Sequence, residues 1–316
     1  MNIMTRQEIE AILPSLELVP IIEAGFVAYS KGWAVVPPVG ELLLDRGDVH
    51  IKYGYIRHDD YYVIKIASGF YDNGRYGLST SNGLMLLFRQ QTGELQSVLL
   101  DEGRLTDIRT AVAGAIAAKH LAPTDVERIG IVGAGIQARL QLQHLAAATP
   151  CRKVLVWDRT DAQREQYRHD MSAHGFQVEM TGEQQEILRQ CNLIVTCTPA
   201  TEPLLQVADL RPGTHITAVG ADTPHKQELD GAILGRADLV VADSIAQCLV
   251  RGEIHQAVKG GFLAEGNIVE LGSIVYGAIP GREDPEQITV ADLTGVAVQD
   301  IQIAKAVYEA AVTTLP

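Results

Sequence analysis

The sequence predicts an α/β fold, in which a doubly wound parallel sheet is joined to an N-terminal mixed α/β domain. The chain has 316 residues, more than one hydrophobic core usually serves, so two domains are expected. Short apolar strands alternate with helices after about residue 121, whereas strands and turns dominate the part before it. We therefore expect one domain from residues 1–120 together with 298–316, and a second from residues 121–297.

The composition excludes several classes of protein. A net charge of −13 argues against nucleic-acid binding, because phosphates demand clustered Lys and Arg. No apolar run reaches the roughly 18 residues of a membrane span, and no basic stretch precedes an apolar one at the start, so the cytoplasm is the expected compartment. Neither a Cys-x-x-Cys pair nor metal-ligand spacing to histidine occurs, so we expect no metal and four reduced, buried thiols, at Cys151, Cys191, Cys197 and Cys248.

The expected N-terminal domain begins with helix. Apolar residues recur at helical spacing up to about residue 35, and Thr5 with Glu8 forms a capping box. Short segments rich in Val, Ile, Leu and Tyr then predict a mixed sheet, with strands at Glu41–Leu44, His50–Ile56, Tyr61–Ile66, Leu84–Arg89 and Leu95–Leu100. An Ala-rich helix follows from Thr106 to about His120.

The second domain is predicted from a regular alternation. Helices are expected at Ile136–Ala148 and Asp161–His174 between strands, which implies a parallel sheet with right-handed crossovers. The expected strands are Arg128–Val132, Lys153–Trp157, Leu193–Cys197, His215–Val219, Leu239–Ala242 and Ile288–Leu293. The last helix, Val298–Val312, is apolar on one side and is expected to fold back onto the first domain.

The sharpest motif is the Gly-x-Gly-x-x-Ala turn between the first strand and helix of this domain. Gly133 permits a tight turn, Gly135 lets the backbone approach a pyrophosphate, and Ala138 allows close packing of helix on strand. The pyrophosphate would then lie on the positive helix N-terminus, which is the Rossmann arrangement. The predicted contacts of this turn with a dinucleotide are Gly133, Gly135, Ile136, Gln137 and Ala138.

An acid about 20 residues beyond the turn supports this interpretation. Asp158 ends the next strand, where a carboxylate binds both ribose hydroxyls and favours NAD. Arg159 follows directly and could accept a 2′-phosphate, so NADP is the alternative. A glycine turn that holds no cofactor is the other alternative.

Two later strand ends are also predicted to line the cofactor cleft, because ligands bind at the carboxyl ends of parallel strands. Their alternative is ordinary loop chemistry. The residues are Thr196, Cys197 and Thr198 after one strand, and Val219, Gly220 and Ala221 after the other.

Two lysines lie in otherwise apolar strand segments. Lys65 is the stronger candidate for a catalytic role, because a lysine in such a strand needs a partner or a function. Lys52 presents the same choice with a weaker case. The alternative for both is an edge strand that points its lysine at water.

One arginine and one aspartate complete the candidate chemistry. Arg109 lies near the start of the Ala-rich helix, where it suits a carboxylate or phosphate, and its alternative is a salt bridge to Asp107 or Asp101. Asp222 follows a strand end, and its alternative is a turn before Pro224. An arginine that fixes a carboxylate, with lysine and aspartate that exchange protons, would suffice for imine chemistry beside a nicotinamide.

The chain resembles the ornithine cyclodeaminase/μ-crystallin family, which includes ketimine reductases and an alanine dehydrogenase branch. The matching segments span most of the chain in the family's order. They are Leu105–Ala113, Ile131–Ala138, Ile194–Pro199, Ile216–Asp222, Val241–Ser244 and Gly295–Asp300.

The resemblance implies roles for several residues. Lys65 is similar to the active-site lysine, Arg109 to the arginine that binds the substrate carboxylate, and Asp222 to the carboxylate that transfers a proton. Thr110 would lie near the cofactor phosphates. The stretch that would face the nicotinamide is Thr294, Gly295 and Val296. The resemblance also implies a homodimer that pairs its N-terminal sheets.

One position departs from the family pattern. Many members carry an arginine that helps to hold the substrate carboxylate where this chain has Gly40. Lys52 could replace it, since it is a cation on the next strand segment.

Three functions remain open from the sequence. The first is an NAD(P)H-dependent reductase of small α-imino acids, or amino acid dehydrogenase, acting on a ketimine, iminosuccinate or alanine-type substrate. The second is an ornithine cyclodeaminase-type lyase in which NAD is catalytic, and the third is a non-catalytic binder of a dinucleotide or small ligand.

Overall fold

The computed structural model describes residues 1–314, and these residues form two compact units. The first unit comprises residues 1–109 and the chain from residue 296 onward, and the second comprises residues 110–295. Helix α3 (Arg104–Leu121) runs from one unit into the other. No single helix in the described chain has the length and apolarity needed to cross a membrane.

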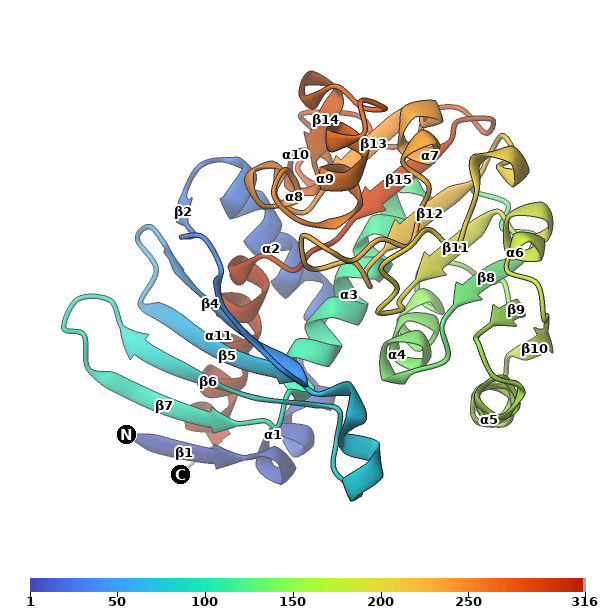
Figure 1. Ribbon diagram of the computed structural model, residues 1–316. Helices are drawn as coiled ribbons and strands as arrows, with labels where there is room; N and C mark the ends of the chain where they lie inside the picture. Colours follow the sequence, from blue (N-terminus) through green and yellow to red (C-terminus); the bar gives the residue numbers. More distant parts are fainter. Residues whose placement is uncertain (315–316) are drawn as a thin grey trace. The chain divides into compact units, whose positions relative to one another are not determined.

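The first unit is built on a seven-stranded mixed sheet with the order β1-β7-β6-β5-β4-β2, and β3 pairs with β4 beside this path (Figure 1). Neighbouring strands are antiparallel except β1 and β7. The strands are β1 (Asn2–Thr5), β2 (Ala34–Val35), β3 (Gly40–Leu44), β4 (Gly47–Ile56), β5 (Tyr61–Gly69), β6 (Ser81–Arg89) and β7 (Leu95–Leu100).

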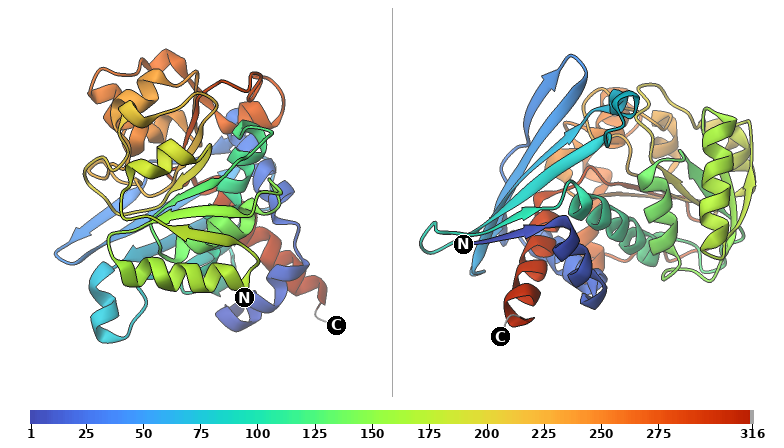
Figure 2. Two further views of the ribbon diagram at one scale, coloured as in Figure 1. Left: turned by 90° about the vertical axis from the view of Figure 1, so that its right-hand side faces the viewer. Right: turned by 90° about the horizontal axis from the view of Figure 1, so that it is seen from below.

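Helices of this unit gather on one side of its sheet. Helix α11 (Ala297–Thr314) contacts β4, β5 and β6 and also packs on α1 (Arg6–Ile12) and α2 (Leu18–Ser30) (Figure 2). The approach to α2 is close, because a Cβ at Gly25 would lie 3.0 Å from the Val298 carbonyl oxygen. The expected return of the last helix to the first part of the chain is therefore confirmed.

Strand pleating divides the side chains of this sheet between two faces. In β4, His50, Lys52, Gly54 and Ile56 are buried, whereas Tyr53 and Tyr55 are exposed. The buried set faces the layer of helices, because successive side chains of a strand point to opposite faces. Within this unit, no helix of the described residues covers the other face.

The second unit contains an eight-stranded, wholly parallel sheet with the order β10-β9-β8-β11-β12-β15-β13-β14. The order reverses between β8 and β11, and in such sheets ligands bind beyond the carboxyl ends at this point. The strands are β8 (Ile129–Val132), β9 (Lys153–Trp157), β10 (Gln177–Met180), β11 (Leu193–Thr196), β12 (His215–Ala218), β13 (Leu239–Ala242), β14 (Ile268–Glu270) and β15 (Thr289–Asp292).

Helices cover both faces of this sheet, so the predicted doubly wound fold is confirmed. One apolar core joins the strands to the second part of α3 and to α4 (Ile136–Leu145) and α5 (Asp161–Ala173). A separate core joins them to the helices of the other face. The remaining helices of the unit are α6 (Gln185–Gln190), α7 (Gly231–Arg236), α8 (Ile245–Cys248), α9 (Gly252–Lys259) and α10 (Leu271–Val275).

The sequence prediction was wrong in a few local places. The expected helix over the first 35 residues starts with strand β1 and is divided by the 3₁₀ turn Leu13–Ser15, which contains a proline. The capping box of Thr5 and Glu8 is confirmed. Strands β10 and β14 were not predicted, because β10 is largely exposed and β14 has only three residues. Of the four cysteines, only Cys191 and Cys248 are buried.

Candidate functional site

Two buried lysines lie side by side on the helix-covered face of the first unit's sheet. Lys52 on β4 and Lys65 on β5 are cross-strand partners, so their side chains leave the sheet on the same face. Lys65 is 1% exposed and Lys52 is 5% exposed. Strand β5 lies between β4 and β6, so the alternative of a lysine that points at water from an edge strand is wrong.

A carboxylate from the far end of the chain meets these cations. Asp300, in the first turn of α11, lies 3.1 Å from the Lys65 Nζ and accepts a hydrogen bond of 3.0 Å from the Arg109 Nε. Its neighbour Gln299 accepts a second bond from Arg109, from Nη1 at 2.7 Å. The arginine for which the sequence left open a salt bridge to Asp107 or Asp101 thus has its carboxylate partner on α11.

Burial and charge tune this cluster. Burial, followed by the neighbouring Arg109 cation, lowers the pKa of Lys65 to about 7, while Asp300 opposes the change. Burial alone would raise the pKa of Asp300, but Arg109, Lys65 and Lys52 together lower it. Three basic side chains thus act on the Asp300 carboxylate and favour its charged form.

The cluster also contains a buried amide nitrogen, the Nε2 of Gln299, that makes no hydrogen bond within the described residues. Gln299 is 1% exposed, and its Nε2 has no hydrogen-bond partner among the described residues. The bond from Arg109 requires that the other amide atom be the oxygen, so Nε2 is a buried donor that lacks an acceptor. Such groups are rare and point to a ligand atom that completes the set.

The glycine turn of the second unit has the predicted geometry. Gly133 has φ +105°, and its N–H donates to the Trp157 carbonyl at 2.8 Å. A Cβ at Gly133 would lie 3.0 Å from the Cys197 carbonyl oxygen, whereas a Cβ at Gly135 would meet nothing within 4 Å. Gly135 and Ile136 are exposed at the start of α4, Gln137 is half-buried, and Ala138 is buried. The turn therefore leaves open space at the helix N-terminus, as a bound diphosphate needs.

Asp158 is tied directly to this turn. Its carboxylate accepts the Ala134 N–H at 2.9 Å and the Thr160 N–H at 3.4 Å. The side chain is thus held at the carboxyl end of β9 beside the glycine turn, where a ribose diol would lie. Arg159 next to it is exposed.

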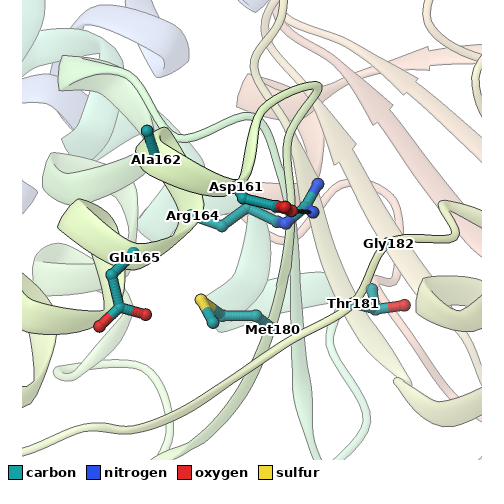
Figure 3. Close-up of a pocket in the computed structure, with 7 residues that line it drawn as sticks. All are labelled: Asp161, Ala162, Arg164, Glu165, Met180, Thr181 and Gly182. Atoms are coloured by element: carbon teal, nitrogen blue, oxygen red, sulfur yellow. Dashed lines mark hydrogen bonds and ion pairs between the residues drawn. The ribbon is translucent and has the colours of Figure 1, made fainter.

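A shallow hollow adjoins the same segment (Figure 3). The guanidinium of Arg164 binds the Asp158 carbonyl and the Asp161 carboxylate, so its charge is already paired. The hollow is lined by Asp161, Ala162, Arg164, Glu165, Met180, Thr181 and Gly182.

The two later strand ends are held together by a residue that the sequence did not reveal. Glu228 is fully buried and accepts hydrogen bonds from the Thr196 hydroxyl at 2.8 Å, the Thr198 N–H at 2.6 Å and the Gly220 N–H at 2.9 Å. Burial raises its pKa to about 7 against the effect of these bonds. A single carboxylate thus joins the loops after β11 and β12, which carry the predicted residues Thr196–Thr198 and Val219–Ala221.

Asp222 lies just beyond these loops and is half-buried. Its carboxylate accepts a hydrogen bond of 2.7 Å from the Lys226 Nζ, and Arg251 binds its backbone carbonyl at 3.1 Å. The side chain is therefore paired with a cation rather than used only to cap a turn before Pro224.

The remaining predicted residues are firmly placed by buried groups. Asp243, which the sequence did not single out, accepts the Thr294 hydroxyl at 3.2 Å and the Gly295 N–H at 2.6 Å. Val296 is buried, and the Thr110 carbonyl accepts a bond of 3.1 Å from the Gln141 amide. The sequence near Glu228, Asp243 and Asp300 does not indicate that these carboxylates accept the hydrogen bonds described, because their partners include residues far away along the chain.

The glycine turn, the acid at the end of β9 and the reversal of strand order define a dinucleotide-binding α/β protein. The ornithine cyclodeaminase/mu-crystallin family model matches residues 1–314, so the chain belongs to that family, and the resemblance predicted from its motifs is confirmed.

Individual relatives cover nearly the whole chain. An uncharacterised cyclodeaminase of Sinorhizobium fredii is 41% identical over 98% of this chain and 96% of its own. Alanine dehydrogenase of Archaeoglobus fulgidus is 33% identical over 98% of this chain and 95% of its own. Among solved structures, the Thermococcus litoralis Δ1-pyrroline-2-carboxylate reductase in complex with NADH and L-proline has a TM-score of 0.93 at 29% identity, covering 99% and 98% of the two chains.

Proposed function

We propose that this protein is an NAD-dependent oxidoreductase that reduces small α-imino acids at C=N, or in the reverse direction oxidises the CH–NH₂ group of an amino acid. The observation that carries the proposal is the buried group of Lys52, Lys65 and Arg109 around Asp300. Relatives named iminosuccinate reductase, at 31% identity, and alanine dehydrogenase, at 33%, support the reaction class.

The cation group would bind the substrate carboxylate. Lys52, Lys65 and Arg109 gather near one another, and an anion that enters a buried site gains more from basic groups there than it would in water. The Nε2 of Gln299 offers a neutral donor for the same carboxylate. Lys52 supplies the cation that position 40, a glycine, does not.

The cofactor would be held by the second unit. The diphosphate would lie on the open N-terminus of α4, with the ribose on Asp158 and the nicotinamide near the loops joined by Glu228 and Asp243. NAD, when bound, supplies or accepts a hydride at the substrate carbon. Asp158 favours NAD over NADP, since its carboxylate would repel a 2′-phosphate and Arg164 is already paired with Asp161.

Lys65 and Asp222 would handle the proton at the substrate nitrogen. A group whose pKa lies near 7 can both donate and accept a proton at neutral pH, and burial brings Lys65 to that point. Asp222 is half-buried, and its carboxylate is held by the ion pair with Lys226.

One contact favours a second candidate, the cyclodeaminase reaction. The Glu41 Oε1 lies 3.0 Å from the His50 Nε2, and His50 is buried two residues before Lys52 on the same face of β4. A diamino acid whose carboxylate is bound by Lys52 would need an acid for its distal ammonium, and Glu41, the cross-strand partner of His50, is a candidate for that acid.

Steady-state assays separate the candidates. The reductase should oxidise NADH when pyruvate is supplied with ammonia or methylamine, or when a cyclic α-imino acid is supplied alone. The cyclodeaminase should release ammonia from ornithine or lysine with NAD and no net NADH. A melting temperature that rises with NAD, without either activity, would contradict both and leave a non-catalytic binder.

We also propose that the protein is a homodimer joined through the helix-free face of the first unit's sheet. An unbroken apolar row crosses five strands there, and a homologous archaeal alanine dehydrogenase is a dimer. The row consists of Ile3, Val98, Leu86, Ile64 and Tyr53. Light scattering should give twice the chain mass, and Tyr53→Asp together with Ile3→Asp should give a folded monomer; a monomeric wild type would overturn the proposal.

A further inference from the structure

We infer that Asp300 is a positioning residue for the proposed reaction, which fixes the Lys65 amine and the Arg109 guanidinium relative to each other without itself touching the substrate. The inference rests on the proposed function. It goes beyond it by assigning a role to a carboxylate on the last helix.

The geometry makes Asp300 the point where three elements meet. Lys65 comes from β5, Arg109 from α3, and Asp300 from the first turn of α11, at separations of 235 and 191 residues along the chain. All three residues are at most 3% exposed. A lysine stem has four rotatable bonds, so a fixed anion at 3.1 Å decides which rotamer the amine adopts.

The arginine is fixed from two sides by the same helix turn. Asp300 accepts a hydrogen bond from the Arg109 Nε, and Gln299 accepts one from Nη1. These two bonds set the plane of the guanidinium. The other terminal nitrogen, Nη2, takes no part in these two bonds and would be the donor left for a substrate carboxylate.

The arrangement of the contacts argues against a purely structural ion pair. A buried pair with matched charges adds little to stability, and apolar residues often replace it without loss. Here one buried carboxylate binds two basic groups, the Lys65 amine and the Arg109 guanidinium, and so sets their positions relative to each other. Arg109, Lys65 and Lys52 lower the pKa of Asp300 against the effect of burial. Asp300 also lies in the first turn of an 18-residue helix, where the macrodipole favours an anion.

The test compares Asp300→Asn with a matched change elsewhere on the same helix. Lys305 of α11 is bound to Asp59 at 2.7 Å, so Asp59→Asn also removes an ion pair that fastens α11. For Asp300→Asn we expect kcat of the reductase at pH 7 to fall by about 10- to 100-fold. Loss of the anion should also move the Lys65 limb of the pH–rate profile to lower pH by about one unit or more. Asp59→Asn should leave the limb in place, and Asp300→Glu should restore it in part.

A second measurement does not require turnover. The pH dependence of the free energy of unfolding reports the proton on Lys65, so the pH at which stability begins to rise should also move down in Asp300→Asn. If this dependence and the pH–rate limb both match wild type, the role of Asp300 is overturned. If wild type reduces no imine while the unfolding profile still moves in Asp300→Asn, the proposed function fails and the control of Lys65 by Asp300 stands. If Asp300→Asn does not fold, the same two measurements are made on Asp300→Glu. If its pH–rate profile, its unfolding profile and its activity all equal those of wild type, the distance of the carboxylate from Lys65 and Arg109 does not matter, and the positioning role is overturned.

Discussion

Replacing Lys65 by methionine should change the way stability depends on pH. Burial and the neighbouring cations lower the pKa of Lys65 from 10.5 to about 7 in the folded protein. Between these values the unfolded chain holds a proton that the folded chain has lost. The unfolded state therefore binds more protons, and the stability of wild type rises with pH across this window.

The size of the effect follows from the two pKa values. At about 1.4 kcal/mol per pH unit, the shift corresponds to roughly 5 kcal/mol over the whole window, and to about 3 kcal/mol between pH 7.5 and pH 9.5. A methionine side chain at this position has no proton to lose. The difference in unfolding free energy between wild type and Lys65→Met should therefore grow by about 3 kcal/mol over those two pH units in favour of wild type. Constant differences in packing cancel from this comparison.

The assay can be confined to the unit that holds Lys65. The chain has two tryptophans, Trp33 in the first unit and Trp157 in the second. With Trp157→Phe in every protein, urea unfolding followed by fluorescence reports the first unit alone. Lys153→Met, which removes an exposed lysine at the start of β9, serves as the control and should give no such change. A difference between wild type and Lys65→Met that is flat from pH 7.5 to pH 9.5 would refute the reasoning.

Three further predictions address the second unit. Asp222→Asn should lower kcat by at least about 100-fold, because a general acid–base group is lost; steady-state NADH oxidation measures it, and near-normal turnover would exclude the assigned role. Asp158→Ala should raise the dissociation constant for NADH several-fold and that for NADPH less, as isothermal titration would show, whereas equal values for wild type and variant would mean that the ribose contact is misassigned. Glu228→Gln should destabilise the protein by about 1–3 kcal/mol and weaken NADH binding, because an amide donor would then face the donors that Glu228 now accepts; thermal melts with and without NADH test this, and an unchanged shift by NADH would contradict it.

The architecture was largely predictable because its signals are local. Strand and helix periods, and the turn at Gly133, each depend on residues within a few positions of one another. The strands that were not predicted, β1, β2, β10 and β14, are short or exposed and lack an apolar run of strand length. Their pairing is decided by neighbours far away along the chain.

For each contact of the candidate site, the sequence predicted one of the two residues but not its partner. A lysine in an apolar strand indicated that Lys65 needs a partner, but nothing near it in sequence identifies Asp300, 235 residues later. Glu228 shows the same limit, because its ligands are backbone and hydroxyl groups of loops up to 32 residues away. Sequence patterns reveal groups that are out of place in their own segment, whereas the partner is chosen by the topology of the fold.

The division of the first unit into two stretches of chain has a consequence for biosynthesis. A ribosome releases residues 1–109 and then the whole of 110–295 before α11 exists. The parallel sheet of the second unit can therefore assemble during translation. The sheet of the first unit still lacks α11, the helix that covers its lysine-bearing face, during that time. Lys65 and Arg109 can bind the Asp300 carboxylate only when α11 has been synthesised, so the nascent first unit lacks this buried ion pair until synthesis is nearly finished.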